Sequence, residues 1–342
     1  MATKEKAISL RRLKESVGLL LKKANLYIDG INLEQMTGDG SIREFYRFKG
    51  NDGHSWILMH NPPKTEVERK ENFAYLSIGK HLFSKNLPLP AIIEFDLEHG
   101  LFILDDLGDI HLEKAVCSND PIPLYEKAVE ILFRIQRDGK QNFDINWCYH
   151  TPYYDEELKL RDECHYFRDA LIKKHFGIQV DDLSLDKSFM YLGEKSEYNS
   201  NLLFLHRDFQ SRNIMLRENG SLAVIDWQGG RIGPPGYDLA SLAYDPYPGM
   251  DVSVREHIIN CYKELISCHE PMSLDSFVSG FRYLAIHRVL QMLGAFAYLS
   301  SIGKVKFQNY IKPALDNLRG LLDEVKSPEL NELNSVLERI PV

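Results

Sequence analysis

The chain has 342 residues, of which 44% are hydrophobic and 26% are charged, so its composition is that of a globular protein and excludes disordered and fibrous classes. Its net charge of −8 argues against a nucleic-acid partner, because proteins that bind nucleic acids usually present a basic surface. Five scattered cysteines without zinc-ligand spacing, and the absence of an apolar run of about 18 residues, predict a cytoplasmic protein with reduced thiols and no membrane span.

The first third of the chain predicts a small domain in which one helix crosses a β-sheet. The N-terminal AISLRRLKESVGLLLKKANL is mildly amphipathic, and its periodicity favours a packed helix over a helix on a membrane surface. REFYRFKG and SWILMH predict a hairpin around NDGH, and AIIEFD and LFILDD predict a second hairpin. Residues 66–87, between the hairpins, have helical periodicity. We therefore predict an N-terminal lobe at residues 1–107, with a hinge at 104–108.

The remainder of the chain, residues 108–342, is predicted to be a mainly helical lobe. A β insertion at residues 202–239 interrupts it, which indicates that these strands serve the chemistry of the protein. The expected fold class is therefore α+β, with a small β-rich lobe and a large helical one. Amphipathic helices are expected at residues 123–138, 155–175, 253–268, 274–300 and 307–325.

The insertion contains the constellation that carries the predicted chemistry. LLFLHRDFQSRNIMLRENGSLAVIDWQGG predicts a strand, a polar loop and a hairpin whose turn contains Asn-Gly, so residues 202–228 hold a catalytic loop and a metal-binding hairpin. Asp208 lies in the loop, Asn213 begins one strand and Asp226 ends the next. Phosphoryl transfer needs one carboxylate to accept the proton of the attacking hydroxyl and two hard oxygen ligands to hold magnesium on the nucleotide phosphates. HRDxxxxN followed by a strand-end Asp is the kinase pattern, and polar residues that merely cap a loop would not need all of these features.

Two segments of the small lobe are candidates for nucleotide binding. The glycine-rich turn in TGDGSIREFYRF could offer backbone N–H groups to phosphates, and a plain hairpin turn is the alternative. LFILDDLGD ends in an acidic bend that suits a hinge with backbone groups facing adenine, and an ordinary linker is the alternative. The candidate nucleotide-binding residues are Gly38, Asp39, Gly40, Ser41, Asp105 and Leu107.

The segments FLHRDFQSRNIML, LAVIDWQGGRIGPPGYDLASL and LFILDDLGD resemble the loop, metal strand and hinge of the aminoglycoside phosphotransferase family of kinase-like enzymes. The resemblance implies a two-lobed fold with ATP in the cleft, Asp208 as catalytic base, Asn213 and Asp226 as Mg²⁺ ligands, and residues 38–41 as the phosphate loop. ILMHNPP, PYYDEELKLRDE and HRVLQMLGAFAYLSSIGK resemble members that phosphorylate the cell-wall sugars N-acetylmuramate and N-acetylglucosamine at C1. This likeness implies a kinase for the anomeric hydroxyl of an N-acetylated amino sugar, with a nucleotidyltransferase downstream.

The sequence departs from the kinase pattern where a lysine usually grips the phosphates. The strand SWILMH has Met59 or His60 in that place, as the sugar-kinase members also have Met. Lys64 is a possible substitute, although a solvated loop lysine is the favoured interpretation, and no glutamate partner is assigned. Because the lysine is missing, a catalytically silent nucleotide-binding module is an alternative function. The presence of Asp208, Asn213 and Asp226 argues against this alternative.

The acceptor is the least constrained feature of the sequence. Gln210 and Gly229 stand where His and Asp are expected in the sugar kinases, so the acceptor could differ, and an aminoglycoside, choline or a hydroxy-amino acid are alternatives. Sugar hydroxyls are usually held by pairs of hydrogen bonds. Trp227 is expected to pack between the lobes rather than against a sugar ring. Candidate substrate-binding residues are Gln210, Arg212, Gln228 and Asp155.

His287 and Arg288 interrupt an apolar helix near the end of the chain. A buried arginine needs a partner, so we expect Arg288 to pair with a carboxylate near Asp238, with substrate contact as the alternative. Asp238 itself is expected to cap a helix behind the catalytic loop.

Overall fold

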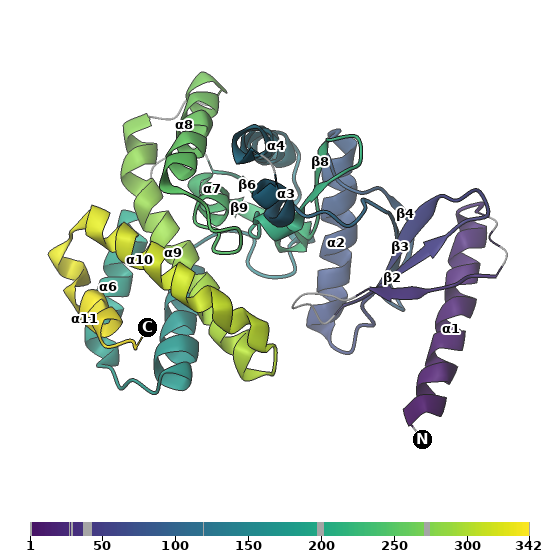
Figure 1. Cartoon of the computed structure of the whole chain (residues 1–342), viewed down its shortest axis with the longest axis horizontal. Helices are drawn as coiled ribbons and strands as arrows, with labels where there is room; N and C mark the ends of the chain where they lie inside the picture. Colours follow the sequence, from purple (N-terminus) through teal and green to yellow (C-terminus); the bar gives the residue numbers. More distant parts are fainter. Residues whose placement is uncertain are drawn as a thin grey trace.

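An antiparallel five-stranded sheet forms the small lobe in the computed structural model of the chain, which describes residues 2–26, 28, 30–36, 43–118, 120–196, 202–269 and 274–341. The strands follow the order β1-β2-β3-β5-β4, so the two predicted hairpins lie side by side in one sheet (Figure 1). Strand β1 was not predicted. The strand bounds are β1 Glu34–Met36, β2 Glu44–Lys49, β3 Ser55–His60, β4 Ile92–Asp96 and β5 Leu101–Asp105.

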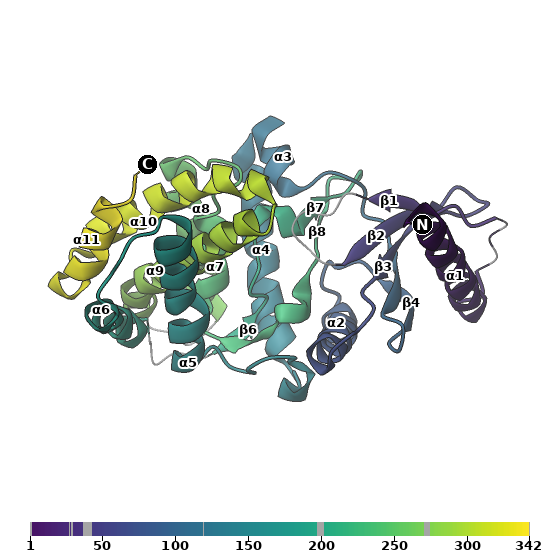
Figure 2. The ribbon, with the colours of Figure 1, turned by 90° about the horizontal axis from the view of Figure 1, so that it is seen from below.

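Two helices, α1 (Ala2–Lys23) and α2 (Glu66–Ser84), cover opposite faces of this sheet (Figures 1 and 2). Alternate side chains of β3 point to opposite faces, so Trp56 and Leu58 pack in the cluster that includes α1, while Met59 packs in the cluster that includes α2. The first helix is therefore a packed helix, as predicted.

Helix α2 begins at a capping box, which explains its N-terminal boundary. The Thr65 hydroxyl accepts the N–H of Glu68 at 3.2 Å, and the Glu68 carboxylate accepts the N–H of Thr65 at 2.8 Å. The helix ends at Ser84 rather than at residue 87, because Asn86 adopts a left-handed conformation with φ of 55°.

The large lobe is built from helices around α9 (Leu274–Ser301), most of whose described apolar side chains are buried. The predicted helices at 123–138, 253–268 and 274–300 are confirmed, and 155–175 is one helical stretch whose turns from Lys159 onward are π-helical. At 307–325 the α-helix begins only at Ile311, after a 3₁₀ stretch. The principal helices are α3 Leu112–Ser118, α4 Pro121–Lys140, α5 Glu156–Leu158, α6 Asp182–Lys195, α7 Gly236–Ala243, α8 Val252–His269, α10 Ile311–Val325 and α11 Asn331–Glu338.

The predicted β insertion is present, and it forms two small sheets between the lobes. Strand β6 (Leu203–Leu205) pairs with the unpredicted β9 (Arg231–Gly233), and β7 (Ile214–Leu216) pairs with β8 (Leu222–Val224) as the expected hairpin. No helix among the described residues has the length and apolar character needed to cross a membrane.

Trp227 joins the lobes, as predicted. Its indole N–H donates to the Tyr75 carbonyl of α2 at 2.8 Å, and its ring stacks on the Tyr75 ring at 4.6 Å. Gly79, one turn further along α2, permits this approach, since a Cβ there would lie 2.7 Å from the indole ring. The small lobe is thereby packed directly against the hairpin that carries Asp226.

Candidate active site

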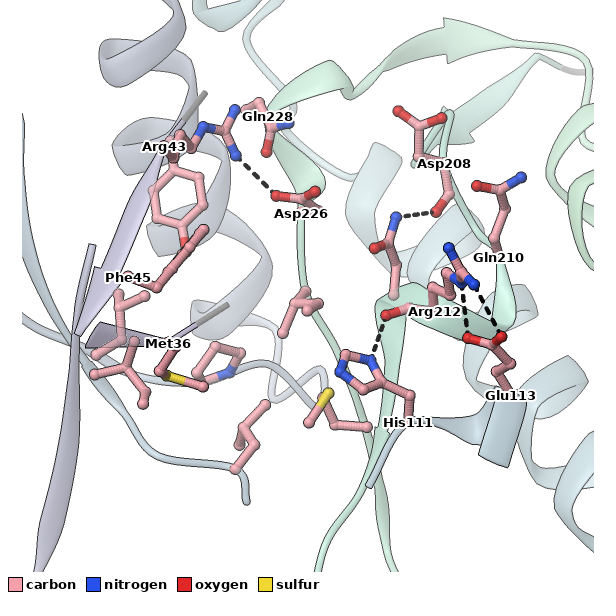
Figure 3. A pocket seen from close by; sticks show the side chains of 18 of the residues that line it. Met36, Arg43, Phe45, His111, Glu113, Asp208, Gln210, Arg212, Asp226 and Gln228 are labelled. Atoms are coloured by element: carbon pink, nitrogen blue, oxygen red, sulfur yellow. Dashed lines mark hydrogen bonds and ion pairs between the residues drawn. The ribbon is translucent and has the colours of Figure 1, made fainter. Parts of the chain in front are cut away.

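A cleft of about 1050 Å³ lies between the small lobe and the large lobe. The sheet and α2 form one wall, and the catalytic loop, the β7–β8 hairpin and α9 form the other (Figure 3). Asp208, Asn213 and Asp226 all line this cleft, so the structure brings together the three residues on which the sequence argument depends.

Asp238 of α7 holds the backbone of the catalytic loop. Its buried carboxylate accepts the N–H groups of His206 at 2.7 Å and of Arg207 at 2.8 Å. Asp238 was expected to cap a helix, and this was wrong: its carboxylate accepts backbone N–H groups of the catalytic loop and not those of a helix N-terminus. Arg207 has φ of 79°, a conformation that L-residues rarely adopt, and these hydrogen bonds help to hold it.

The Asp208 carboxylate faces the cleft beside a buried arginine. Its side chain is 46% exposed, and its Oδ1 accepts from Nη2 of Arg288 at 3.2 Å. The other terminal nitrogen of Arg288, Nη1, donates to Gln291 at 2.6 Å. Arg288 therefore pairs with Asp208. From the sequence we had expected its partner to be a carboxylate near Asp238. Burial raises the pKa of Asp208, but the positive charges of Arg288 and Arg207 outweigh it and hold this pKa below its usual value. Asp208 is thus kept ionised, as a proton acceptor must be.

Asn213 and Asp226 present oxygen atoms to the same space. The Asn213 amide NH₂ donates to the Asp208 carbonyl at 2.8 Å, which leaves its Oδ1 for another partner. Asp226 follows β8 with φ of 70°, and its side chain is 38% exposed in the cleft. One amide oxygen and one carboxylate are hard ligands of the kind that Mg²⁺ prefers, so the residues present fit this metal.

Arg43 is a functional candidate that the sequence analysis did not find. It lies just before β2 and donates to Asp226 at 2.8 Å (Figure 3). It also donates to Glu71 of α2 at 2.5 Å. Burial lowers the pKa of Arg43, but the charges of Asp226 and Glu71 raise it above the ordinary value, so the guanidinium stays charged. The available signal was an arginine directly after the glycine-rich turn.

The residues considered for the phosphate grip do not provide it. Met59 is buried in the apolar core, His60 pairs with Glu44 at 3.0 Å, and Lys64 is exposed and does not line the cleft.

Beside the hinge, part of the cleft is lined by apolar side chains from both lobes, and such a surface suits a flat aromatic ring. Asp105 and Leu107 line the cleft at the end of β5, and the Asp105 carboxylate accepts the N–H of Ala91 at 3.1 Å. The other candidates in the glycine-rich turn, residues 38–41, lie outside the described residues. The apolar side chains that line the hinge side of the cleft come from both lobes, namely Met36, Phe45, Ile57, Leu104, Met215 and Ile225.

The four candidate acceptor-binding residues have different surroundings. Gln210 and Gln228 line the cleft, and the Gln210 amide contacts the Met292 sulfur at 3.1 Å. Arg212 also lines it, but its guanidinium is held by both carboxylate oxygens of Glu113, at 2.7 and 3.0 Å. Asp155 does not line the cleft, because its side chain caps α5 by accepting an N–H at 2.9 Å.

The family model described as "Phosphotransferase enzyme family" matches residues 35–263. The chain is 26% identical over 318 residues to the N-acetylmuramate/N-acetylglucosamine kinase of Pseudomonas aeruginosa, a match that covers 89% of this chain and 87% of the relative. The kinase of the same name from Neisseria meningitidis is 26% identical over 294 residues, which covers 82% of this chain and 83% of the relative.

Solved structures share the fold at low sequence identity. The choline kinase LicA from Streptococcus pneumoniae superposes with a TM-score of 0.62 at 16% identity, covering 91% of this chain and 99% of that one. The amicoumacin kinase hAmiN, solved with AMP-PNP, Ca²⁺ and Ami, superposes with a TM-score of 0.60 at 13% identity, covering 93% of this chain and 96% of that one. These similarities agree with the two-lobed, kinase-like fold expected from the sequence.

Proposed function

The chain belongs to the phosphotransferase enzyme family and is a small-molecule kinase that phosphorylates an alcohol, and from this premise we propose that it transfers the γ-phosphoryl group of ATP to the anomeric hydroxyl of an N-acetylated amino sugar. The observation that carries the proposal is the convergence of Asp208, Asn213 and Asp226 on one cleft. The names of the relatives from P. aeruginosa and N. meningitidis support the choice of acceptor.

In the proposed mechanism, the chain's own residues orient the acceptor and move its proton. The acceptor hydroxyl donates to the Asp208 carboxylate, which takes the proton as the oxygen attacks the γ-phosphorus. The bond between the γ-phosphorus and the β–γ bridging oxygen breaks, and ADP leaves with the electron pair of that bond. Arg288 holds the Asp208 carboxylate in place by the hydrogen bond of 3.2 Å to its Oδ1. Asn213 and Asp226 would hold Mg²⁺, which when bound neutralises phosphate charge. The apolar hinge side of the cleft would receive the adenine and exclude water from one end of the nucleotide.

The charges of the acceptor side are paired with one another, which favours a neutral acceptor over a cationic one. Arg288 brings a positive charge beside Asp208, and Gln210 and Gln291 add neutral hydrogen-bonding groups. Glu113, which also lines the cleft, is neutralised by Arg212. Because Asp208 and Glu113 are already compensated by arginines, they attract a cationic acceptor such as choline or an aminoglycoside only weakly, whereas Gln210 and Gln291 can hydrogen-bond the hydroxyls of the acetylated sugars.

The test is a screen for ADP release with N-acetylmuramate, N-acetylglucosamine, choline and an aminoglycoside, with and without Mg²⁺. We expect turnover with the two acetylated sugars, its loss in EDTA, and an acid-labile phosphate that ³¹P NMR locates on C1. Phosphate on C6, or turnover with choline alone, would contradict the proposed acceptor. A sugar 1-phosphate product would suit a downstream nucleotidyltransferase.

The pH dependence of turnover tests the role of Arg288. Arg288→Gln removes a positive charge that lowers the pKa of Asp208, so this pKa is expected to rise. Because only ionised Asp208 can accept the proton, the acid limb of the kcat profile should move to higher pH. At neutral pH, kcat should fall about tenfold, which corresponds to one charge-assisted hydrogen bond of about 1.5 kcal/mol.

Arg282→Gln on the same helix provides the control for Arg288→Gln. Arg282 forms an exposed pair with Glu324 at 2.7 Å, so this variant should retain the parent profile. An acid limb that stays in place in Arg288→Gln would show that Arg288 does not act on the ionisation of Asp208.

A further inference from the structure

The strand that usually supplies the phosphate-binding lysine offers no cation to the cleft. Ile57 and Met59 of β3 point to the α2 side, where Ile57 lines the cleft and Met59 is 1% exposed in the apolar core. His60, the last residue of the strand, pairs with Glu44 at 3.0 Å. A nucleotide bound in this cleft would therefore need a positive charge from another element.

The pairing of β2 with β3 places Arg43 on the face where that charge is missing. Phe45 lies directly opposite Met59 in the register, and residues two apart along a strand share a face. Arg43, two residues before Phe45, is therefore a diagonal neighbour of Met59 on the α2 side. A long side chain spans such a diagonal distance of about 7–8 Å.

The surroundings of Arg43 match those of the absent lysine. Its side chain is 7% exposed, and one nitrogen contacts Glu71 of α2 while the other contacts Asp226. A pair between a small-lobe cation and a glutamate of the crossing helix is the arrangement that orients the phosphate-binding lysine in kinases. Here the cation comes from the start of β2 instead of from β3.

The other arginines that line the described part of the cleft are held away from the two metal-ligand candidates. Arg47 is fixed by Asp106, at 2.7 and 3.0 Å, on the hinge side. Arg212 is fixed by Glu113, and its guanidinium lies 3.7 Å from the centroid of the Tyr247 ring. Arg288 lies beside Asp208 on the acceptor side.

We propose that Arg43 binds the nucleotide phosphates in place of the missing lysine and that Glu71 positions it, an inference that rests on the proposed function. When nucleotide and metal bind, Arg43 exchanges the Asp226 carboxylate for a phosphate oxygen, because the carboxylate is then needed by the metal. The planar guanidinium can keep Glu71 on one nitrogen while the other binds phosphate.

Binding of ADP and of adenosine by calorimetry tests this role without requiring turnover. Arg43→Met should weaken ADP binding about 10- to 100-fold, both with Mg²⁺ and in EDTA, while adenosine affinity changes by less than about twofold. Glu71→Gln, which leaves the cation but loosens it, should weaken ADP binding about three- to tenfold. Retained adenosine binding reports that the cleft is folded in each variant.

Two further variants make the test specific. Lys64→Met, at the exposed lysine outside the cleft, should bind ADP like the parent. Arg43→Lys keeps the positive charge but loses the planar set of guanidinium donors. Its affinity for ADP should fall less than tenfold, and its affinity for adenosine should not change. The role of Arg43 is overturned if Arg43→Met binds ADP like the parent, or if ADP and adenosine weaken equally in Arg43→Lys. Failure of the unmodified protein to bind ADP would overturn the proposed function as well, whereas ADP binding without turnover of amino sugars would overturn only the proposed acceptor.

Discussion

Replacement of Asp208 by Asn is expected to lower kcat about 1000-fold while nucleotide affinity stays within about threefold of the parent. Asn has the shape of Asp and can still accept from Arg288, which lies 3.2 Å from Oδ1, but it cannot take the proton of the acceptor hydroxyl. Because Asp208 faces the acceptor side and not the apolar hinge side, the substitution should spare adenine binding. The measurement is steady-state ADP release with saturating acceptor, together with the dissociation constant of ADP.

Asp155→Asn is the matched control for this prediction. Asp155 caps α5 and does not line the cleft, and Asn is an equally good N-cap. Its kcat should equal that of the parent. A kcat for Asp208→Asn within tenfold of the parent would show that another group accepts the proton.

The catalytic and metal candidates could be predicted because they are close together in the sequence. Asp208, Asn213 and Asp226 lie on one loop and one hairpin, and the hairpin turn brings the ends of its strands together regardless of the rest of the fold. Arg43 and Asp226 are 183 residues apart, and their contact depends on how the lobes pack. Local spacing carries no information about such a pair, so the sequence could show that a lysine was missing but not what replaces it.

The elements that escaped prediction have physical reasons for it. Strands β1 and β9 have three residues each and lack the apolar run that indicated the equally short β6, β7 and β8. A helix at Asp238 was expected, but every residue of α7 is buried, so the helix has no polar face from which its bounds could be predicted. Asp155 has a side chain that could bind a sugar hydroxyl, and it also stands where a helix cap is expected. The sequence does not distinguish these two roles.

A second large effect is expected in a buried network behind the catalytic loop, centred on Glu163. This carboxylate is fully buried and accepts the hydroxyls of Tyr154 at 2.6 Å and of Tyr237 at 2.7 Å. It also accepts from Arg207 at 3.0 Å, and the Arg207 guanidinium lies 4.6 Å from the centroid of the Tyr237 ring. Arg207 precedes Asp208 in the loop, so the network anchors the loop to the helical lobe from its inner side.

We expect Glu163→Gln to lower the free energy of unfolding by about 3–5 kcal/mol, because it leaves the buried charge of Arg207 without the carboxylate that compensates it. Urea unfolding followed by circular dichroism measures the loss. Glu157→Gln, in an exposed pair with Arg161 whose side chains are 72% and 49% exposed, should cost less than about 1 kcal/mol. Equal stabilities for the two variants would mean that the tyrosines and Asp208 suffice to hold Arg207. A large loss in Glu163→Gln alone would mean that the ion pair with Arg207 stabilises the large lobe, and, because Arg207 directly precedes Asp208, that the stability of this lobe depends on an interaction made by the catalytic loop.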